Sequence, residues 1–155
     1  MQVIWVNHAD STGESQSSPT GQANLDQIDY VLRILPRSRA ALKDSALGEA
    51  LPCPPDEAVC FANVFYNRVE QRTEVERISL EQVLGHAMAH ELGHLLLGSN
   101  SHSSTGIMSG KWRADELKRA AKGDLLFTAQ QARIIHDHAL AKINQREALQ
   151  LSAPP

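Results

Sequence analysis

Three residues in one short stretch, His90, Glu91 and His94, have the types and spacing of a metal-dependent catalytic site. Four residues of helix turn through about 400°, so His90 and His94 would lie one above the other on one face. Two imidazoles placed in this way can bind one Zn²⁺ ion, and a Glu next to the first can reach a water bound to that ion. The stretch therefore predicts a zinc site with Glu91 as the general base.

The residues around this motif predict that it lies on a buried helix. From 84 to 98 the neighbours are apolar almost all round, and a buried helix rarely holds two His and a Glu without partners for them. Gly93 costs about 1 kcal/mol relative to Ala inside a helix. We therefore expect another part of the chain to require bare backbone at Gly93.

The ends of this helix can also be predicted. Ser79 followed by Gln82 is typical of a capping box at a helix N-terminus. Gly98 suits the left-handed position that follows a helix C-terminus. The expected helix runs from Leu80 to Leu97, about five turns.

Beyond the helix the chain resembles the metzincin clan of zinc peptidases, whose pattern is His-Glu-x-x-His-x-x-Gly-x-x-His followed by a turn that holds a Met beneath the metal. Here His94 is followed by Gly98, His102 and the sequence Ile-Met-Ser at 107–109. The order of these parts agrees with the clan. The spacing departs from it, because Gly98 is one residue late and the third His comes eight residues after His94 where the family has six.

The resemblance covers about residues 84–112 and implies a minimal, metzincin-like zincin. It implies that His90, His94 and His102 bind Zn²⁺, that Glu91 is the base, and that Met108 is the Met-turn residue. An ordinary core Met is an alternative interpretation of Met108.

A different third ligand is also compatible with the sequence. In gluzincins a Glu on a later helix completes the site, and Glu116 lies 22 residues after His94. The same segment, 112–118, is equally typical of a solvated helix start. We favour His102, because the glycine that ends the helix, the Ser/Asn turn and the nearby Met all point to it.

The surrounding pattern predicts an α+β, zincin-like fold with a small mixed sheet, a long active-site helix, a Met turn and a C-terminal helix. Strands are expected at Val3–Val6, Ile28–Leu35 and Ala58–Tyr66, whereas 37–50 is expected to be a short helix or a loop. By resemblance, the 58–66 strand would be an edge strand that pairs with extended substrate. An internal strand without substrate contact is the alternative.

Downstream of the Met turn, two further helices are expected. The first spans Arg113–Ala121 and is ended by Gly123 and Asp124. A second capping box, Thr128 with Gln131, opens a helix that continues to about Glu147.

Composition describes a globular protein, with 42% hydrophobic and 21% charged residues in 155. This length suits one catalytic domain over residues 1–155, with a flexible loop over 11–24 and a tail over 149–155. The chain opens on strand-like residues, so we expect its original N-terminus, with any export signal, to have been removed or replaced.

Charge and hydropathy narrow the range of partners. The net charge is −3 and no basic cluster appears, which argues against nucleic acid. No run of 18 apolar residues occurs, so no membrane span is predicted. A monomer that acts on a peptide or protein substrate is expected.

Cys53 and Cys60 are the two cysteines in the chain. Their short separation permits a disulfide, which would fit a secreted or periplasmic enzyme, but two buried thiols and a cytoplasmic location are also compatible.

Together these features predict a zinc-dependent peptidase that hydrolyses peptide bonds. The alternative is a zincin-fold module that binds metal without cutting peptides. The unusual spacing of His102 is compatible with this alternative. An intact Glu91 argues for the enzyme, because a purely structural metal site has no use for a base.

Overall fold

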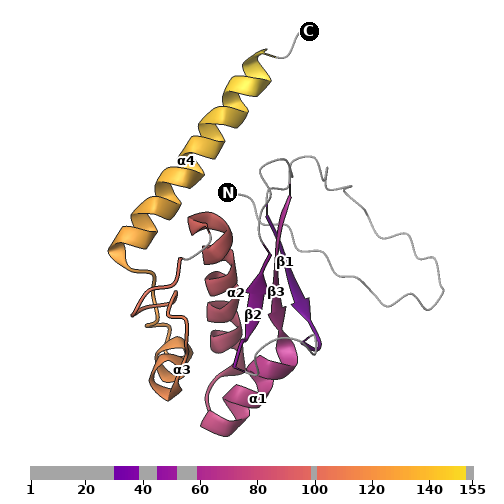
Figure 1. The fold of residues 1–155 in the computed structure, drawn as a ribbon, viewed down its shortest axis with the longest axis vertical. Helices are drawn as coiled ribbons and strands as arrows, with labels where there is room; N and C mark the ends of the chain where they lie inside the picture. The colour runs from indigo at the N-terminus through magenta and orange to yellow at the C-terminus, as the bar shows by residue number, and fades with distance from the viewer. Residues whose placement is uncertain (1–29, 39–44, 52–58, 99–100, 153–155) are drawn as a thin grey trace, which may run out of the picture.

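The computed structural model describes residues 30–38, 45–51, 59–98 and 101–152. Within these ranges a small three-stranded sheet and four helices make up a mixed α+β fold, as expected (Figure 1). The elements follow in the order β1 Tyr30–Leu35, β2 Gly48–Ala50, β3 Cys60–Phe65, α1 Tyr66–Glu76, α2 Leu80–Leu97, α3 Ala114–Ala121 and α4 Ala129–Ser152.

The sheet has β3 in its middle, with the strand order β1-β3-β2. β1 runs parallel to β3, and β2 runs antiparallel to it. Five of the six residues of β3 are buried, as a strand covered on both faces requires. The expectation that the 58–66 strand lies at an edge is therefore wrong.

In the described sheet β1 and β2 are the two edge strands. β2 falls in the segment expected to be a helix or a loop. It is three residues long and contains Gly48, Glu49 and Ala50, none of which favours a strand. Its strand conformation comes from pairing with β3, where Gly48 lies opposite Val64 and Ala50 opposite Ala62. Such pairing depends on tertiary contacts, so the local pattern does not predict it.

Helix α2 has the bounds that the sequence predicted, Leu80–Leu97. At its start the Ser79 hydroxyl accepts a hydrogen bond from the backbone of Gln82, at 3.3 Å. At its end Gly98 has φ +87° and ψ 179°. The positive φ agrees with the prediction, but the residue is extended rather than left-handed helical, a conformation that only glycine adopts easily.

α2 is the central element of the fold, which explains why it is apolar almost all round. It contacts the three strands and the other three helices, with the sheet on one side and α3 on another (Figure 1). The buried core around it consists of Val64, Val69, Val83, Ala87, Ile107, Met108, Leu117, Ala120 and Leu125.

Helices α3 and α4 agree with the predictions in most respects, whereas α1 was not predicted and begins at Tyr66, the last residue of the expected strand. α3 spans Ala114–Ala121, and Gly123 follows it with φ +80°. The capping box of α4 is present in both directions, since Thr128 N donates to Gln131 Oε1 and Gln131 N donates to Thr128 Oγ1. α4 continues to Ser152, past the predicted end at Glu147 and into the expected tail.

Some predictions fall outside the described residues, namely the strand at Val3–Val6, the loop at 11–24 and the state of Cys53. Cys60 is disulfide-bonded, so the alternative of two free thiols is wrong for this residue.

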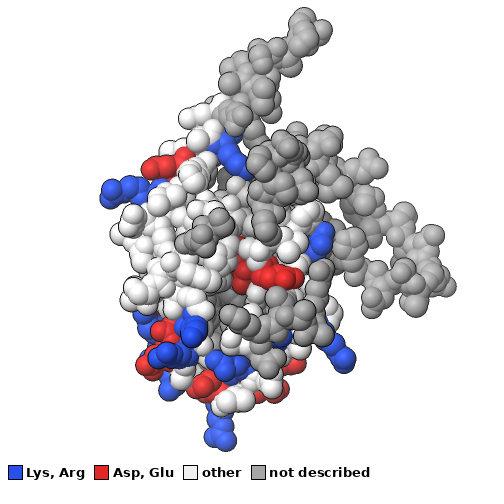
Figure 2. All heavy atoms as spheres, in the orientation of Figure 1, with Lys and Arg blue, Asp and Glu red and all other residues white. Residues whose placement is uncertain are grey.

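The surface has no basic stripe on the face seen in Figure 2. Lys and Arg are interleaved with Asp and Glu, mainly at the end of the molecule formed by α1 and α3. No helix in the described ranges has the length and apolar character needed to cross a membrane.

Candidate metal centre

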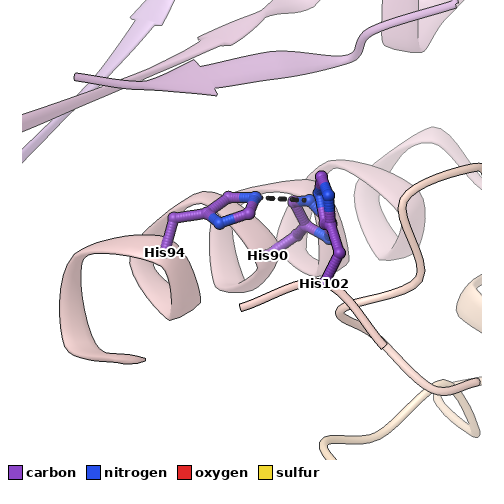
Figure 3. Close-up of side chains that lie close together, drawn as sticks. All are labelled: His90, His94 and His102. Carbon is purple, nitrogen blue, oxygen red and sulfur yellow. Dashed lines mark hydrogen bonds between the residues drawn. The ribbon is translucent and has the colours of Figure 1, made fainter. Parts of the chain in front are cut away.

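The structure brings His90, His94 and His102 together (Figure 3). His90 and His94 project from the same face of α2, and His102 approaches them from the segment that follows the helix. One ring nitrogen of each lies within 4.8 Å of the others. The three histidines singled out by the sequence therefore form a cluster that could hold a metal ion.

Hydrogen bonds at the far side of two rings fix how they face the cluster. His90 Nδ1 lies 2.6 Å from the carbonyl oxygen of Ile107, and His94 Nδ1 lies 2.8 Å from Ser101 Oγ. Because a carbonyl only accepts, the His90 Nδ1 carries hydrogen, and a neutral His90 presents a lone pair at Nε2. Anchoring of this kind fixes the tautomer of metal-binding histidines.

The two Nε2 atoms of His90 and His94 lie 3.1 Å apart. With Zn–N bonds of about 2.0–2.1 Å in a tetrahedral arrangement, two ligand nitrogens would be roughly 3.4 Å apart. The pair is therefore already close to a chelating separation. His102 is the exposed member of the cluster, so its ring has room to adjust.

Burial keeps the two helical histidines neutral, as metal binding requires. It is the largest cause that lowers the pKa of His90, and the Ile107 carbonyl partly opposes it. Burial, with neighbouring His90 and His102, lowers the pKa of His94 to about 4. At neutral pH both rings can therefore offer a lone pair.

Glu91 lies beneath the edge strand β2. The residue is 5% exposed, and its Oε2 has no hydrogen-bond partner among the described residues. A Cβ built at Gly48 would lie 2.6 Å from Glu91 Cγ and Oε1. Gly48 therefore allows the strand backbone to approach the carboxylate closely, and burial followed by the charge of Glu49 raises the pKa of Glu91 to about 8.

Met108 packs against the backbone of helix α2 at Gly93. Met108 is fully buried in a turn closed by a hydrogen bond from Ser109 N to the carbonyl of Gly106, at 3.0 Å. A Cβ on Gly93 would collide with Met108 Sδ and would lie 2.9 Å from the Phe127 ring. The space beside Gly93 is thus filled by the sulfur of Met108 and the edge of the Phe127 ring. This packing explains why the helix has a glycine at this position, as expected.

Glu116 takes no part in the cluster of described metal-binding side chains. Its carboxylate instead accepts a hydrogen bond from Arg113 N, at 2.9 Å, and caps the first turn of α3. This is the ordinary helix start that the sequence offered as the alternative. The structure places the His102 ring in the cluster, but its role as a metal ligand stays a prediction.

The histidines and Glu91 line a cleft of about 710 Å³. Its opposite wall is the segment 45–51, which contains β2, and Trp112 lies at its border. Sequence reasoning did not identify this wall. It also missed Trp112, whose Nε1 donates to the Ile107 carbonyl at 3.2 Å and whose ring meets the His90 ring edge-on.

No protein-family model, curated protein or solved structure matches this chain. The interpretation of the cluster therefore depends on its own geometry and chemistry.

Proposed function

We propose that this protein is a zinc-dependent peptidase. The observation that carries the proposal is the convergence of three imidazoles, from His90, His94 and His102, beside the buried carboxylate of Glu91 in one cleft. Two anchored neutral imidazoles and a third, exposed one suit Zn²⁺, which prefers nitrogen ligands and in catalytic sites keeps one position open.

The donor set fits such an ion on physical grounds. In the metal-free cluster a hydrogen bond of 3.1 Å joins the two Nε2 atoms, with the Nε2–H of neutral His94 donating to the lone pair of His90. A Zn²⁺ ion between these atoms would replace that proton. The unpartnered Oε2 of Glu91 is a second polar group that a metal-associated water would satisfy.

In the proposed reaction Glu91 moves the protons. A bound Zn²⁺ would polarise the scissile carbonyl and make a water acidic near neutral pH. Glu91 accepts a proton from the attacking water and returns it to the leaving amine. The positive charge of the ion favours the ionised carboxylate, which offsets the effect of burial on the pKa of Glu91.

The strand that would hold the substrate is β2. It is the last strand of the described sheet on this side, and Leu47 and Leu51 direct their backbone hydrogen bonds to β3. In an antiparallel ladder the alternate residues, Gly48 and Ala50, point their N–H and C=O groups the other way. An extended peptide could pair with these groups directly above Glu91.

Export remains part of the proposal. The disulfide at Cys60 supports an oxidising location such as the periplasm or the exterior.

Glu91→Gln tests the enzymatic role. In a peptidase this variant retains about one zinc per chain and loses roughly 10²–10⁴-fold in turnover of an unfolded protein such as casein. Elemental analysis and product mass spectrometry measure the two quantities. Zinc in both forms without cleavage by the wild type would instead support the alternative, a metal-binding module.

A further inference from the structure

His102 is held differently from the other two histidines of the cluster. His90 and His94 each have a hydrogen bond at Nδ1. No described residue forms a hydrogen bond with the His102 ring, which faces the rings of His90 and His94 and lies close to Gly110. The position of His102 therefore depends strongly on how its backbone segment is held.

Both neighbours of His102 are bound by one side chain, that of Gln131 in the first turn of α4. Gln131 Nε2 donates to the Ser101 carbonyl at 3.3 Å and to Ser103 Oγ at 3.2 Å. The Ser103 hydroxyl donates its own hydrogen to the Thr105 carbonyl at 2.7 Å, so its oxygen is available to accept. The two contacts enclose His102 on either side.

The orientation of the Gln131 amide is fixed by its partners. Oε1 faces the N–H of Thr128, and Nε2 faces the carbonyl of Ser101. Turning the amide over would place donor against donor and acceptor against acceptor. The capping box of α4 thus holds Gln131 ready to bind the segment that carries His102.

The same segment also supports His94. Ser101, whose carbonyl Gln131 binds, contacts His94 Nδ1 through its hydroxyl. Ser103 N donates to the Met108 carbonyl at 2.8 Å, which ties the segment to the turn beneath α2. A displacement of this segment would therefore move one cluster ring directly and weaken the anchor of a second.

We propose that Gln131 is a positioning residue for the metal centre. Through Ser101 and Ser103 it places His102 for binding and holds the anchor of His94. This inference rests on the metal site of the proposed function but not on peptidase activity.

Gln131→Leu and Thr128→Ala form a matched pair. Each removes one half of the capping box, which costs about 1 kcal/mol of stability, but Gln131→Leu alone removes the contacts to Ser101 and Ser103. We expect the zinc affinity of Gln131→Leu to fall about 10–100-fold, as is usual when a hydrogen bond that orients a ligand is lost. Thr128→Ala should stay within about twofold of the wild type.

Competition between the folded protein and a chromogenic chelator gives the zinc affinity, and the visible spectrum of the Co²⁺ form reports the ligand geometry. Ser103→Ala approaches the contact from the other side. It should weaken zinc binding, and adding it to Gln131→Leu should cost less than the sum of the two single effects. Additive losses would overturn the proposal.

The outcomes separate the two hypotheses. Zinc affinity equal in Gln131→Leu and the wild type, or equally reduced in Thr128→Ala, overturns the role of Gln131 and leaves the peptidase proposal standing. Wild type that binds zinc but cuts no peptide removes the peptidase proposal alone. Wild type that binds no zinc removes both.

Discussion

Glu91 is held in an environment where ionisation is costly. Its carboxyl is buried with one oxygen unpartnered, and its pKa is raised from 4.5 to about 8. Between these values the folded, metal-free chain keeps a proton that the unfolded chain has lost. Stability from this group is therefore greatest at low pH and declines as pH rises towards 8.

His94 has the opposite effect on stability, in a lower range of pH. Its pKa is lowered from 6.5 to about 4, so the unfolded chain binds the extra proton and stability is lost as pH falls below 6.5. The contribution of Glu91 is thus best isolated above pH 6.5.

Metal-free protein should lose roughly 2 kcal/mol of unfolding free energy between about pH 6.5 and 8, because a difference of one bound proton changes this free energy by about 1.4 kcal/mol per pH unit. Urea unfolding in the presence of a chelator measures the loss. Glu91→Gln cannot ionise and should show a flatter profile. If the variant declined as steeply as the wild type, another group would be responsible.

Helix α2 contains two interior glycines in contrasting settings. A Cβ at Gly85 meets nothing within 4 Å, whereas at Gly93 it collides with Met108 and Phe127. Gly85→Ala should therefore stabilise the protein by about 1 kcal/mol through helix propensity alone. Gly93→Ala should destabilise it by about 1–3 kcal/mol, because overpacking outweighs the same gain.

Thermal unfolding of the two variants side by side measures both effects. Gly85→Ala is the control, since it makes the same chemical change in the same helix. Two variants with equal shifts would mean that Met108 yields to the new methyl group at little cost.

Local signals explain which elements could be predicted from sequence. The bounds of α2 and the start of α4 follow from caps and apolar spacing that lie within each segment. β2 could not be predicted, because three residues form a strand here only by pairing with β3. The central position of β3 in the sheet depends on the same pairing.

The same distinction applies to the site. His90, Glu91 and His94 share one helical turn, so their spacing alone predicts their geometry. Whether His102 reaches them depends on how the segment 101–109 folds back, which involves Gln131 and Met108. Glu116 remained an alternative because spacing along the chain does not reveal that its carboxylate caps its own helix.

Across the whole molecule, the proposed metal would join α2 to the segment leading to α3. A ligand that binds only the folded chain stabilises it by a free energy that grows with the ratio of free ligand concentration to Kd. At a ratio of a thousand, this free energy is about 4 kcal/mol. Chelation should therefore lower the Tm of the wild type by several degrees. His102→Ala should lose most of this zinc-dependent shift.

His86→Ala provides the control for that comparison. His86 lies one turn before His90 on α2, but its Nδ1 contacts the carbonyl of Gln82 and it is outside the cluster. Its zinc-dependent shift in Tm should match that of the wild type. A loss as large as in His102→Ala would mean that any histidine on this helix supports binding.

The contacts between Gln131 and the neighbours of His102 also have a consequence for biosynthesis. Gln131 follows His102 by 29 residues, so a chain emerging from the ribosome carries all three histidines well before it carries the side chain proposed to position them. A partly made chain would hold zinc loosely and exchange it readily. Secure loading of the proposed metal would therefore have to wait until residue 131 has been made and α4 has begun to form.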